Sequence, residues 1–477
     1  MDDSTQVSHE LPWTRSGART LGALHLVIAW HAHAPERVGQ SAAVTRACVL
    51  GRGVGDGSEA RLEFARQRPG QLEPTGSLDC KRLSRTQLRL LPGPERLSIH
   101  NAGRCRLFHN GQLCGSAEAR PGDVLTLEDS VVLLVEERKR MWPELPYEGY
   151  CDFVFGEADR SGIVGESEAT WRLREQLRAA AEADAHALIT GSSGSGKELA
   201  GRAIHAWSRR AQGPLVARNA ATFPDTLIDA ELFGSSKNFP NVGAAERAGL
   251  VGEADGGTLI LDEVGELPSA QQAHLLRVLD AGGEYQRLGE SRTRRSNLRV
   301  LGLTNRAPEE LKLDFLARFP IRLRVPDLAE RPSDIPLLMR WIWRELASEQ
   351  PELRERFPSI RGADTAWEPL VEPRLVELLL RSELAHNTRE LERMLRAALA
   401  HSGGRYVGVN TTLESELMRD AEGDLEASGL DLDSDTIVAA LDAARGSPTR
   451  AARSLGLRNR HVLYRLMKKH GIESRGA

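Results

Sequence analysis

The sequence predicts a multidomain protein: an all-β sandwich, then an α/β domain with a helical lid, then a C-terminal all-α segment. Three patterns predict these classes. Short β-rich runs separated by Gly, Pro and Asn fill residues 21–137. Strands alternate with helices over 163–326, and helical periodicity alone fills 327–402. Helical patterning returns over 436–477, and a chain of 477 residues is too long for a single core.

Two connecting segments separate these domains. Residues 138–162 carry Pro, Trp and Tyr without clear periodicity, so we expect a linker with a few docking aromatics. Residues 403–435 are acidic, rich in Gly, Ser and Asp, and lack apolar periodicity, which predicts a flexible linker. The tail from Arg445 to Arg475 is strongly basic, and this asymmetry indicates an anionic partner at the C-terminus.

The composition limits the cellular compartments in which we expect the protein. The five cysteines form no CxxC pair, which argues against a disulfide framework and favours a reducing environment. No apolar run approaches the ~20 residues of a membrane helix, and the segment from Leu21 to Trp30 lacks a basic leader with a cleavage site. We therefore expect a soluble, cytoplasmic protein with no membrane partner.

A glycine-rich loop opens the α/β domain, between the apolar segment Ala185 to Ile189 and the helical pattern Leu199 to Trp207. Its glycines let backbone N–H groups turn toward an anion, the helix N-terminus adds its dipole, and the lysine reaches the outer phosphates. This arrangement predicts a site for ATP. Its residues are Gly191, Ser192, Gly194, Ser195, Gly196, Lys197 and Glu198, the last standing where many such loops have Ser or Thr.

Two carboxylates, Asp262 and Glu263, follow the apolar strand pattern Thr258 to Leu261. The C-terminal end of a strand is where an open α/β sheet displays catalytic groups. Asp262 would hold Mg²⁺ through its water shell, and Glu263 would polarise the water that attacks the γ-phosphate. An acidic pair alone is more often a solvated turn, but together with the lysine loop it predicts an ATPase.

The pair lies in one of five separated motifs: Ile163-Val164-Gly165-Glu166-Ser167, Glu231-Leu232-Phe233-Gly234, Gly256-Gly257-Thr258-Leu259, Leu261-Asp262-Glu263-Val264-Gly265-Glu266-Leu267-Pro268 and Asn387-Thr388-Arg389-Glu390-Leu391. In this order they closely resemble the sigma-54-dependent activators, the bacterial enhancer-binding proteins of the AAA+ class. The resemblance covers about residues 163–402. It implies ATP hydrolysis in a homo-oligomeric ring, a hexamer or similar, that acts on sigma-54 RNA polymerase. Family members carry Glu after the loop lysine, so Glu198 agrees with it.

The resemblance implies roles for further residues. Asn219 matches the asparagine that senses nucleotide and restrains the catalytic glutamate. Asn305 matches sensor I and Arg389 matches sensor II, although Asn305 alone could equally cap a turn and Arg389 alone could equally form a surface ion pair. Arg318 matches the second arginine finger, which reaches the ATP of a neighbouring subunit. Lys312 stands at the first finger position, and lysine lacks the planar fork of arginine.

The loop after Gly234 departs from the family. Where relatives carry G-A-F-T-G-A, which contacts sigma-54, this chain has Asn238-Phe239-Pro240-Asn241-Val242-Gly243. Pro240 stands for the aromatic residue and Asn241 for the threonine, while Phe239 could serve as a shifted aromatic. The target loop is thus expected at Asn238, Phe239, Pro240 and Asn241, with a target other than sigma-54 left open.

The C-terminal segment resembles a Fis-type helix-turn-helix, in which Ala451 and Ala452 permit close packing and Gly456 supplies the turn. This resemblance implies binding to double-stranded DNA at upstream, enhancer-like sites. The candidate groove-contacting residues are Arg458, Asn459, Arg460, His461 and Arg465, and the candidate phosphate contacts are Lys468 and Lys469.

The N-terminal β-rich region resembles a forkhead-associated (FHA) domain in Gly51-Arg52, Ser84-Arg85, Asn110-Gly111 and Pro121-Gly122-Asp123. In that fold Arg52 and Ser84, with Arg85 nearby, would bind a phosphothreonine protein. Gln87 stands where the family has a histidine. The asparagine with which the family grips the peptide has no clean match, and Cys105 lies nearest to its expected position. A structural sandwich that docks the ATPase is an equally weighted alternative.

Taken together, these patterns predict a transcription regulator that binds DNA and hydrolyses ATP to remodel its target. Two alternatives remain open from the sequence. One is a switch that binds ATP without hydrolysing it, favoured by Lys312 and the altered loop. The other is an AAA+ motor that acts on a target other than sigma-54.

Overall fold

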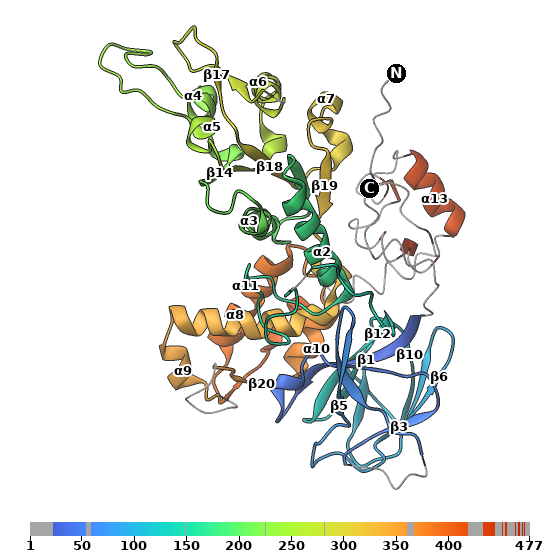
Figure 1. The fold of residues 1–477 in the computed structure, drawn as a ribbon. Helices are drawn as coiled ribbons and strands as arrows, with labels where there is room; N and C mark the ends of the chain where they lie inside the picture. The colour runs from blue at the N-terminus through green and yellow to red at the C-terminus, as the bar shows by residue number, and fades with distance from the viewer. Residues whose placement is uncertain are drawn as a thin grey trace. The chain divides into compact units, whose positions relative to one another are not determined.

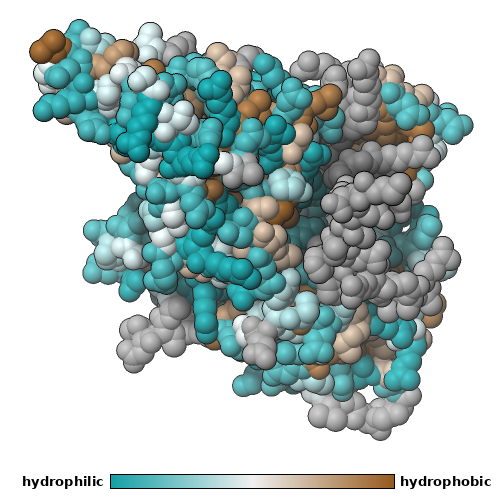
Figure 2. All heavy atoms as spheres, turned by 45° about the horizontal axis from the view of Figure 1, so that its top comes forward, coloured by the Kyte–Doolittle hydropathy of each residue, from teal (hydrophilic) through white to brown (hydrophobic). Residues whose placement is uncertain are grey.

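The computed structural model describes residues 22–53, 59–147, 149–224, 226–280, 282–359, 367–417 and 433–443, with single positions between 451 and 472. The described residues fall into two compact units (Figure 1). The first combines the chain up to Arg172 with Leu328–Ala439, and the second is mainly Leu173–Asp327. On the face drawn in Figure 2, hydrophilic side chains predominate. No helix in the described ranges has both the length and the apolar character needed to span a membrane.

The first unit begins with two antiparallel sheets. The larger has the strand order β5-β4-β2-β1-β12-β11-β8-β9 and the smaller has the order β10-β7-β6-β3. The strands are β1 (Gly22–His31), β2 (Ser41–Ala43), β3 (Cys48–Leu50), β4 (Phe64–Arg68), β5 (Gln71–Gly76), β6 (Leu88–Pro92), β7 (Leu97–Asn101), β8 (Leu107–His109), β9 (Gln112–Cys114), β10 (Ser116–Ala119), β11 (Val124–Leu127) and β12 (Val131–Lys139).

The central strands β1, β11 and β12 of the larger sheet are buried on both faces. In β1, Leu24, Leu26 and Ile28 belong to the core inside the sandwich. Val27 and Ala29 point the opposite way, because successive residues of a strand alternate between faces, and they join a second core shared with the helical lid. The sandwich and the lid are therefore packed together in one unit.

The lid consists of α8 (Ile335–Glu349), α9 (Glu352–Arg356), α10 (Pro373–Arg381) and α11 (Asn387–His401), with the short parallel strands β20 (Leu370–Val371) and β21 (Tyr406–Val407). Helix α10 packs against β1, β11 and β12. Thr126 donates a hydrogen bond to Glu377 (3.3 Å), and Arg381 donates to the carbonyl of Asn110 (2.8 Å). These polar contacts add to the apolar core between the sheet and the lid.

Both segments expected as linkers contain ordered structure. Trp142 and Leu145 are buried with Trp171 in a small aromatic cluster of the first unit. Val407, Leu413 and Leu417 belong to the lid core. The described part of 403–435 up to residue 417 is thus packed on the lid through these three buried side chains.

The second unit is a five-stranded parallel sheet of order β14-β15-β18-β13-β19. Its strands are β13 (Ala187–Thr190), β14 (Leu215–Asn219), β15 (Thr258–Asp262), β18 (Arg299–Thr304) and β19 (Ile321–Arg324), with an antiparallel ribbon of β16 (Glu284–Tyr285) and β17 (Arg294–Arg295). Its helices are α3 (Lys197–Trp207), α4 (Ile228–Phe233), α5 (Leu250–Glu253), α6 (Ser269–Leu279) and α7 (Leu313–Leu316). Helix α2 (Glu168–Ala183) begins in the first unit and continues into the second.

The C-terminal region is described only in part. Helix α13 (Ser434–Ala443) spans the predicted boundary between the acidic linker and the helix-turn-helix. The predicted DNA contacts lie outside the described residues: Arg458, Asn459, Arg460, His461, Arg465, Lys468 and Lys469.

Candidate nucleotide site

The glycine loop runs from β13 into α3, as predicted. Gly194 and Gly196 have φ angles of 73° and 105°, a left-handed conformation that favours glycine. Lys197 is the first residue of α3, and its Nζ donates to the carbonyl oxygens of Gly191 (3.0 Å) and Ser192 (3.1 Å). The ammonium group thus contacts the backbone of the first two residues of the loop.

Other residues hold the start of the loop in place. The backbone N–H of Gly191 donates to the carbonyl of Thr304 (3.3 Å), and a Cβ at Gly191 would lie 3.2 Å from the carbonyl oxygen of Val325. Ser192 donates its hydroxyl to the buried carboxylate of Asp327. Sequence reasoning missed Asp327, because nothing in its local pattern links it to a loop so far away along the chain.

Asp262 ends β15, and its Oδ1 accepts a hydrogen bond from the backbone N–H of Glu263 (2.9 Å). Glu263 has φ 51°, a left-handed conformation that is uncommon for a residue with a side chain and concentrates at functional sites. Its Oε2 is buried and accepts no hydrogen bond from the described residues. Because buried polar atoms are normally satisfied, this oxygen is suited to accept a hydrogen bond from a polar ligand such as water.

The polar residues of the neighbouring strands meet these carboxylates at one sheet edge. Asn219 is directly opposite Asp262 in the parallel pairing of β14 with β15, and its side chain accepts from the N–H of Ala221 (2.9 Å). Thr304 ends β18 and is fully buried, whereas Asn305 is exposed just beyond it. The strand order therefore brings the predicted residues of four strands to the same carboxyl edge.

The structure gives the following positions for three further predicted residues. Glu198 is exposed and pairs with Arg202 on the surface of α3 (2.7 Å). Arg318 forms an ion pair with Asp280 (2.6 Å). Arg389 lies in the first turn of α11 and belongs to the first unit, whereas the glycine loop belongs to the second. Asp280 is a contact that the sequence did not predict, since it follows α6 without any motif.

The carboxylates of the site fit a Mg²⁺ ion that is bound mainly by the phosphates of the nucleotide. Within the described ranges, no group of three or more His, Cys, Asp or Glu residues is arranged to hold a metal ion. Mg²⁺ is typically bound by one or two carboxylates together with nucleotide phosphates, so dedicated protein cages are not required. Asp262, at the strand end beside Glu263, is the residue that fits this role.

The predicted phosphate-binding residues of the sandwich gather in adjacent loops. Arg52 donates its backbone N–H to the carbonyl of Ser84 (3.1 Å), and the hydroxyl of Ser84 accepts from the N–H of Arg104 (3.1 Å). The side chain of Arg61 donates to the carbonyl of Arg85 (3.1 Å). The loops that meet at Ser84 thus carry four arginines. The sequence predicted Arg52 and Arg85, whereas Arg61 and Arg104 lie outside the predicted motifs.

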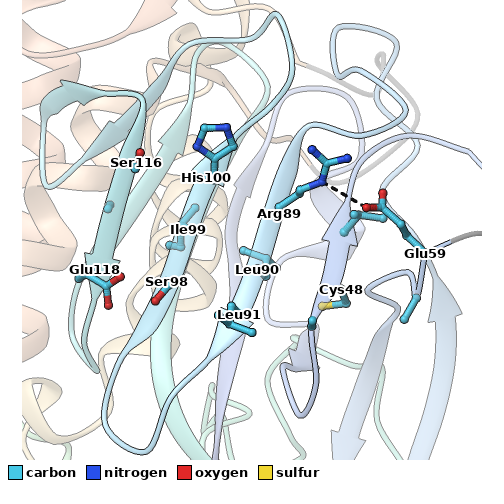
Figure 3. Close-up of a pocket in the computed structure, with 14 residues that line it drawn as sticks. Cys48, Glu59, Arg89, Leu90, Leu91, Ser98, Ile99, His100, Ser116 and Glu118 are labelled. Atoms are coloured by element: carbon cyan, nitrogen blue, oxygen red, sulfur yellow. Dashed lines mark hydrogen bonds and ion pairs between the residues drawn. The ribbon is translucent and has the colours of Figure 1, made fainter.

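Gln87, which replaces the expected histidine, has a structural position. It is fully buried, accepts from the N–H of Ser84 (3.1 Å) and donates to Asn101 (2.7 Å) and to the carbonyl of Cys105 (2.9 Å). A separate groove lies on the outer face of the smaller sheet, where Arg89 pairs with Glu59 (Figure 3). None of the predicted phosphate-binding residues lines that groove.

A parallel sheet with a lysine-bearing glycine loop, an Asp-Glu pair and polar strand ends at one edge defines a P-loop NTPase of the AAA+ class. Residues 163–326 match the sigma-54 interaction domain. The chain is 30% identical over 360 residues to the transcriptional regulatory protein ZraR of Salmonella typhi, covering 73% of this chain and 76% of that protein. It therefore belongs to the family of sigma-54-dependent transcriptional regulators.

The chain is also similar to further proteins. The chain is 35% identical over 319 residues to the Nif-specific regulatory protein of Azotobacter vinelandii, covering 64% of this chain and 58% of that protein. A solved structure of NtrX from Brucella abortus in complex with ATP superposes with a TM-score of 0.46 at 28% identity, covering 66% of this chain and 70% of that one.

Proposed function

We propose that the protein is an ATP-hydrolysing, DNA-binding transcription regulator that assembles into a closed homo-oligomeric ring, a hexamer or similar, and remodels sigma-54 RNA polymerase. The observation that carries this proposal is the geometry of Glu263. Its backbone is left-handed, and its buried Oε2 accepts no hydrogen bond from the described residues. A carboxylate oxygen left in this state beside a phosphate loop suits a group that orients and polarises an attacking water.

The remaining residues of the site have complementary roles. When ATP binds, Lys197 leaves the carbonyls of Gly191 and Ser192 and pairs with the outer phosphates, which offer it stronger, charge-assisted hydrogen bonds. Mg²⁺, held through its water shell by Asp262, supplies neutralisation of the phosphate charge. Asn219, opposite Asp262, reports on the nucleotide. Arg318 of a neighbouring subunit completes the site in the ring.

Steady-state ATPase measurements on the full chain test this proposal. We expect Glu263→Gln to lower kcat by about 100-fold or more, because a general base typically contributes 10²–10⁴ in rate, while binding of a fluorescent ATP analogue persists. Lys197→Ala should lose the binding of that analogue. If the wild type hydrolyses ATP no faster than Glu263→Gln, the protein is instead a non-hydrolytic switch.

The non-hydrolytic switch is favoured by one specific observation. The first finger position is Lys312, which keeps the positive charge but lacks the planar fork of arginine. Replacement of the G-A-F-T-G-A sequence likewise favours a motor acting on a target other than sigma-54. Capture of purified sigma-54 by the ring, trapped with a transition-state analogue of ATP, separates the two targets, and absence of capture would reject sigma-54.

A second function is proposed for the sandwich, which is recognition of a phosphothreonine protein. The proposal is supported by the arginines in the loops that meet at Ser84, because a phosphate forms charge-assisted hydrogen bonds with arginine. We expect a phosphothreonine peptide library to bind the wild type and not Arg52→Ala. Equal binding of phosphorylated and unphosphorylated peptides would favour a purely structural sandwich.

DNA binding is proposed for the basic C-terminal segment. In a gel-shift assay at fixed salt, the double variant Lys468→Ala/Lys469→Ala should bind all DNA more weakly and show a smaller salt dependence. Arg460→Ala should instead weaken discrimination between sequences. Binding that is unaffected by both variants would locate the DNA contact elsewhere.

A further inference from the structure

The chain between α4 and α5 forms a loop with a closed neck. Ser235 and Arg247 exchange both backbone hydrogen bonds (3.1 and 3.0 Å). Beside them, a Cβ at Gly249 would lie 2.3 Å from the backbone nitrogen of Gly234, so only glycine permits this approach. The neck is therefore fixed, and residues 236–246, here called the first loop, project beyond it.

A second loop, residues 286–293 between β16 and β17, lies alongside the first. The N–H of Ser236 donates to the carbonyl of Leu288 (2.9 Å), and the N–H of Leu288 donates to the carbonyl of Gly234 (2.9 Å). The carboxylate of Glu246 pairs with the largely buried guanidinium of Arg287. Backbone hydrogen bonds and an ion pair thus join the two loops near their bases.

Farther out, the ring of Phe239 in the first loop lies on Gly289 of the second. A Cβ at Gly289 would be only 2.5 Å from Cδ2 of Phe239, and Gly289 has φ 75°. No side chain could occupy position 289 without displacing the ring. Phe239 is 37% exposed, so most of the side chain is covered. Its geometry is that of a packing contact between the loops rather than of a group that reaches outward.

The tip of the first loop is closed by Asn238. Its side chain accepts from the N–H of Gly243 (2.9 Å), and its N–H donates to the carbonyl of Ala244 (2.9 Å). Val242 stands between these anchors with 95% of its side chain exposed, more than any other large hydrophobic residue among those described. Hydrophobic atoms stand at the end of this projecting part in Figure 2.

We infer that Phe239 ties the first loop to the second, and that Val242 is the side chain with which the first loop contacts its protein target. The inference rests on the proposed function, in which that target is sigma-54. An exposed, branched aliphatic group on a tip held by its own hydrogen bonds suits a small apolar depression on a protein surface. The two loops then move as one body, and Phe239 acts by positioning the tip.

The contact is tested with the full-length ring trapped by ADP and aluminium fluoride, titrated with purified sigma-54. We expect Val242→Ser to weaken sigma-54 binding by about 10-fold to 100-fold, the value of burying one valine side chain. Leu113→Ser, which removes a 61% exposed apolar side chain from the sandwich, is the matched control and should bind as the wild type does. Equal binding by Val242→Ser and the wild type would overturn the contact.

The positioning role of Phe239 is tested without sigma-54. In Gly289→Ala the added methyl group displaces the ring, so hydrogen exchange of the amides in residues 236–246 should become faster while binding of a fluorescent ATP analogue is unchanged. Unchanged exchange would overturn the positioning role. A wild type that hydrolyses ATP but captures no sigma-54 would refute the proposed target and the Val242 contact with it, and the exchange experiment would still decide the role of Phe239.

Discussion

The guanidinium group of Arg318 lies 2.6 Å from the carboxylate of Asp280 in the same chain. Both side chains are about half exposed, with exposed fractions of 42% and 51%. Ion pairs at such positions contribute about 0–1 kcal/mol, because solvent screens them. The pair therefore restrains Arg318 only weakly, and a neighbouring subunit's ATP could draw the arginine away.

This geometry predicts opposite effects for the two partners on ATP hydrolysis. Arg318→Ala should lower kcat by about 10³-fold or more, the usual contribution of an arginine finger. Asp280→Asn should raise the rate a few-fold, because it frees the guanidinium without altering the shape of the site. Both changes in kcat are measured with ATPase assays over a range of protein concentrations. A normal rate for Arg318→Ala would show that another residue completes the neighbouring site.

Arg68 and Glu166 form the most completely buried ion pair between the sandwich and the motif that precedes α2. Arg68 donates to both carboxylate oxygens of Glu166 (3.1 and 2.5 Å) and to the carbonyl of Phe153 (2.9 Å), over whose ring its guanidinium lies at 4.4 Å. Trp171 also donates to Glu166 (3.0 Å). Loss of one partner would leave the other charge buried and unpaired.

Arg68→Met is accordingly expected to destabilise the first unit by about 3–5 kcal/mol. The double variant Arg68→Met/Glu166→Gln should recover part of that loss, since it removes the uncompensated charge. Arg66→Met is the matched control, because Arg66 forms an exposed pair with Glu73 (3.4 Å) worth less than about 1 kcal/mol. Urea unfolding curves compare the variants, and equal losses for Arg66→Met and Arg68→Met would contradict the argument.

Two buried histidines of the sandwich predict a loss of stability in mild acid. Burial lowers the pKa of His25 to about 3 and that of His31 to about 4, with nearby arginines adding to the shift. Below pH 6.5 these two histidines bind protons in the unfolded chain but not in the folded chain. The free energy of unfolding therefore falls as the pH drops from about 6.5 toward 4. At pH 5 each histidine costs about 2 kcal/mol relative to pH 7.

His25→Leu should therefore reduce the difference in unfolding free energy between pH 7 and pH 5 by about 2 kcal/mol. The substitution loses no hydrogen bond, because neither ring nitrogen of His25 has a partner among the described residues. His100→Leu changes an exposed histidine and is the control. Urea titrations at the two pH values measure the difference, and an unaltered difference for His25→Leu would show that His25 is protonated in the folded protein.

The candidate nucleotide site could be predicted from the sequence, because residues such as Lys197 and Asp262 belong to short motifs at strand ends. The order of the strands in the sheet is then enough to bring these motifs to one edge. The docking of the sandwich on the lid could not. In β1 the run from Leu26 to Ala29 is apolar on both faces, which predicts a strand buried on both sides but does not tell what covers the second face. Phe239 likewise has no local signal that tells packing on Gly289 from exposure.

Asp334 of the lid offers a final prediction, because it fixes the segment that enters α2. The buried carboxylate accepts hydrogen bonds from the backbone N–H groups of Glu166 (2.8 Å) and Ser167 (2.9 Å) and from the hydroxyls of Ser167 and Thr170 (both 2.6 Å). These contacts hold the start of α2 in the first unit, and the helix continues into the second, which carries the nucleotide loop.

Asp334→Asn puts an amide nitrogen where one carboxylate oxygen accepts from the hydroxyls of Ser167 and Thr170, so these hydroxyls must turn to accept from the amide. The charge-assisted hydrogen bonds of the buried carboxylate are lost. We expect a loss of about 2–4 kcal/mol in stability and faster amide exchange at the beginning of α2. Ser333→Ala, which removes the hydroxyl bonded to Arg138 (2.9 Å) and leaves the carboxylate in place, should cost only about 1 kcal/mol. Because α2 continues into the unit that carries the nucleotide loop, Asp334→Asn should also lower kcat for ATP more than Ser333→Ala does. Equal rates in the two variants would mean that order at the start of α2 does not affect ATP hydrolysis.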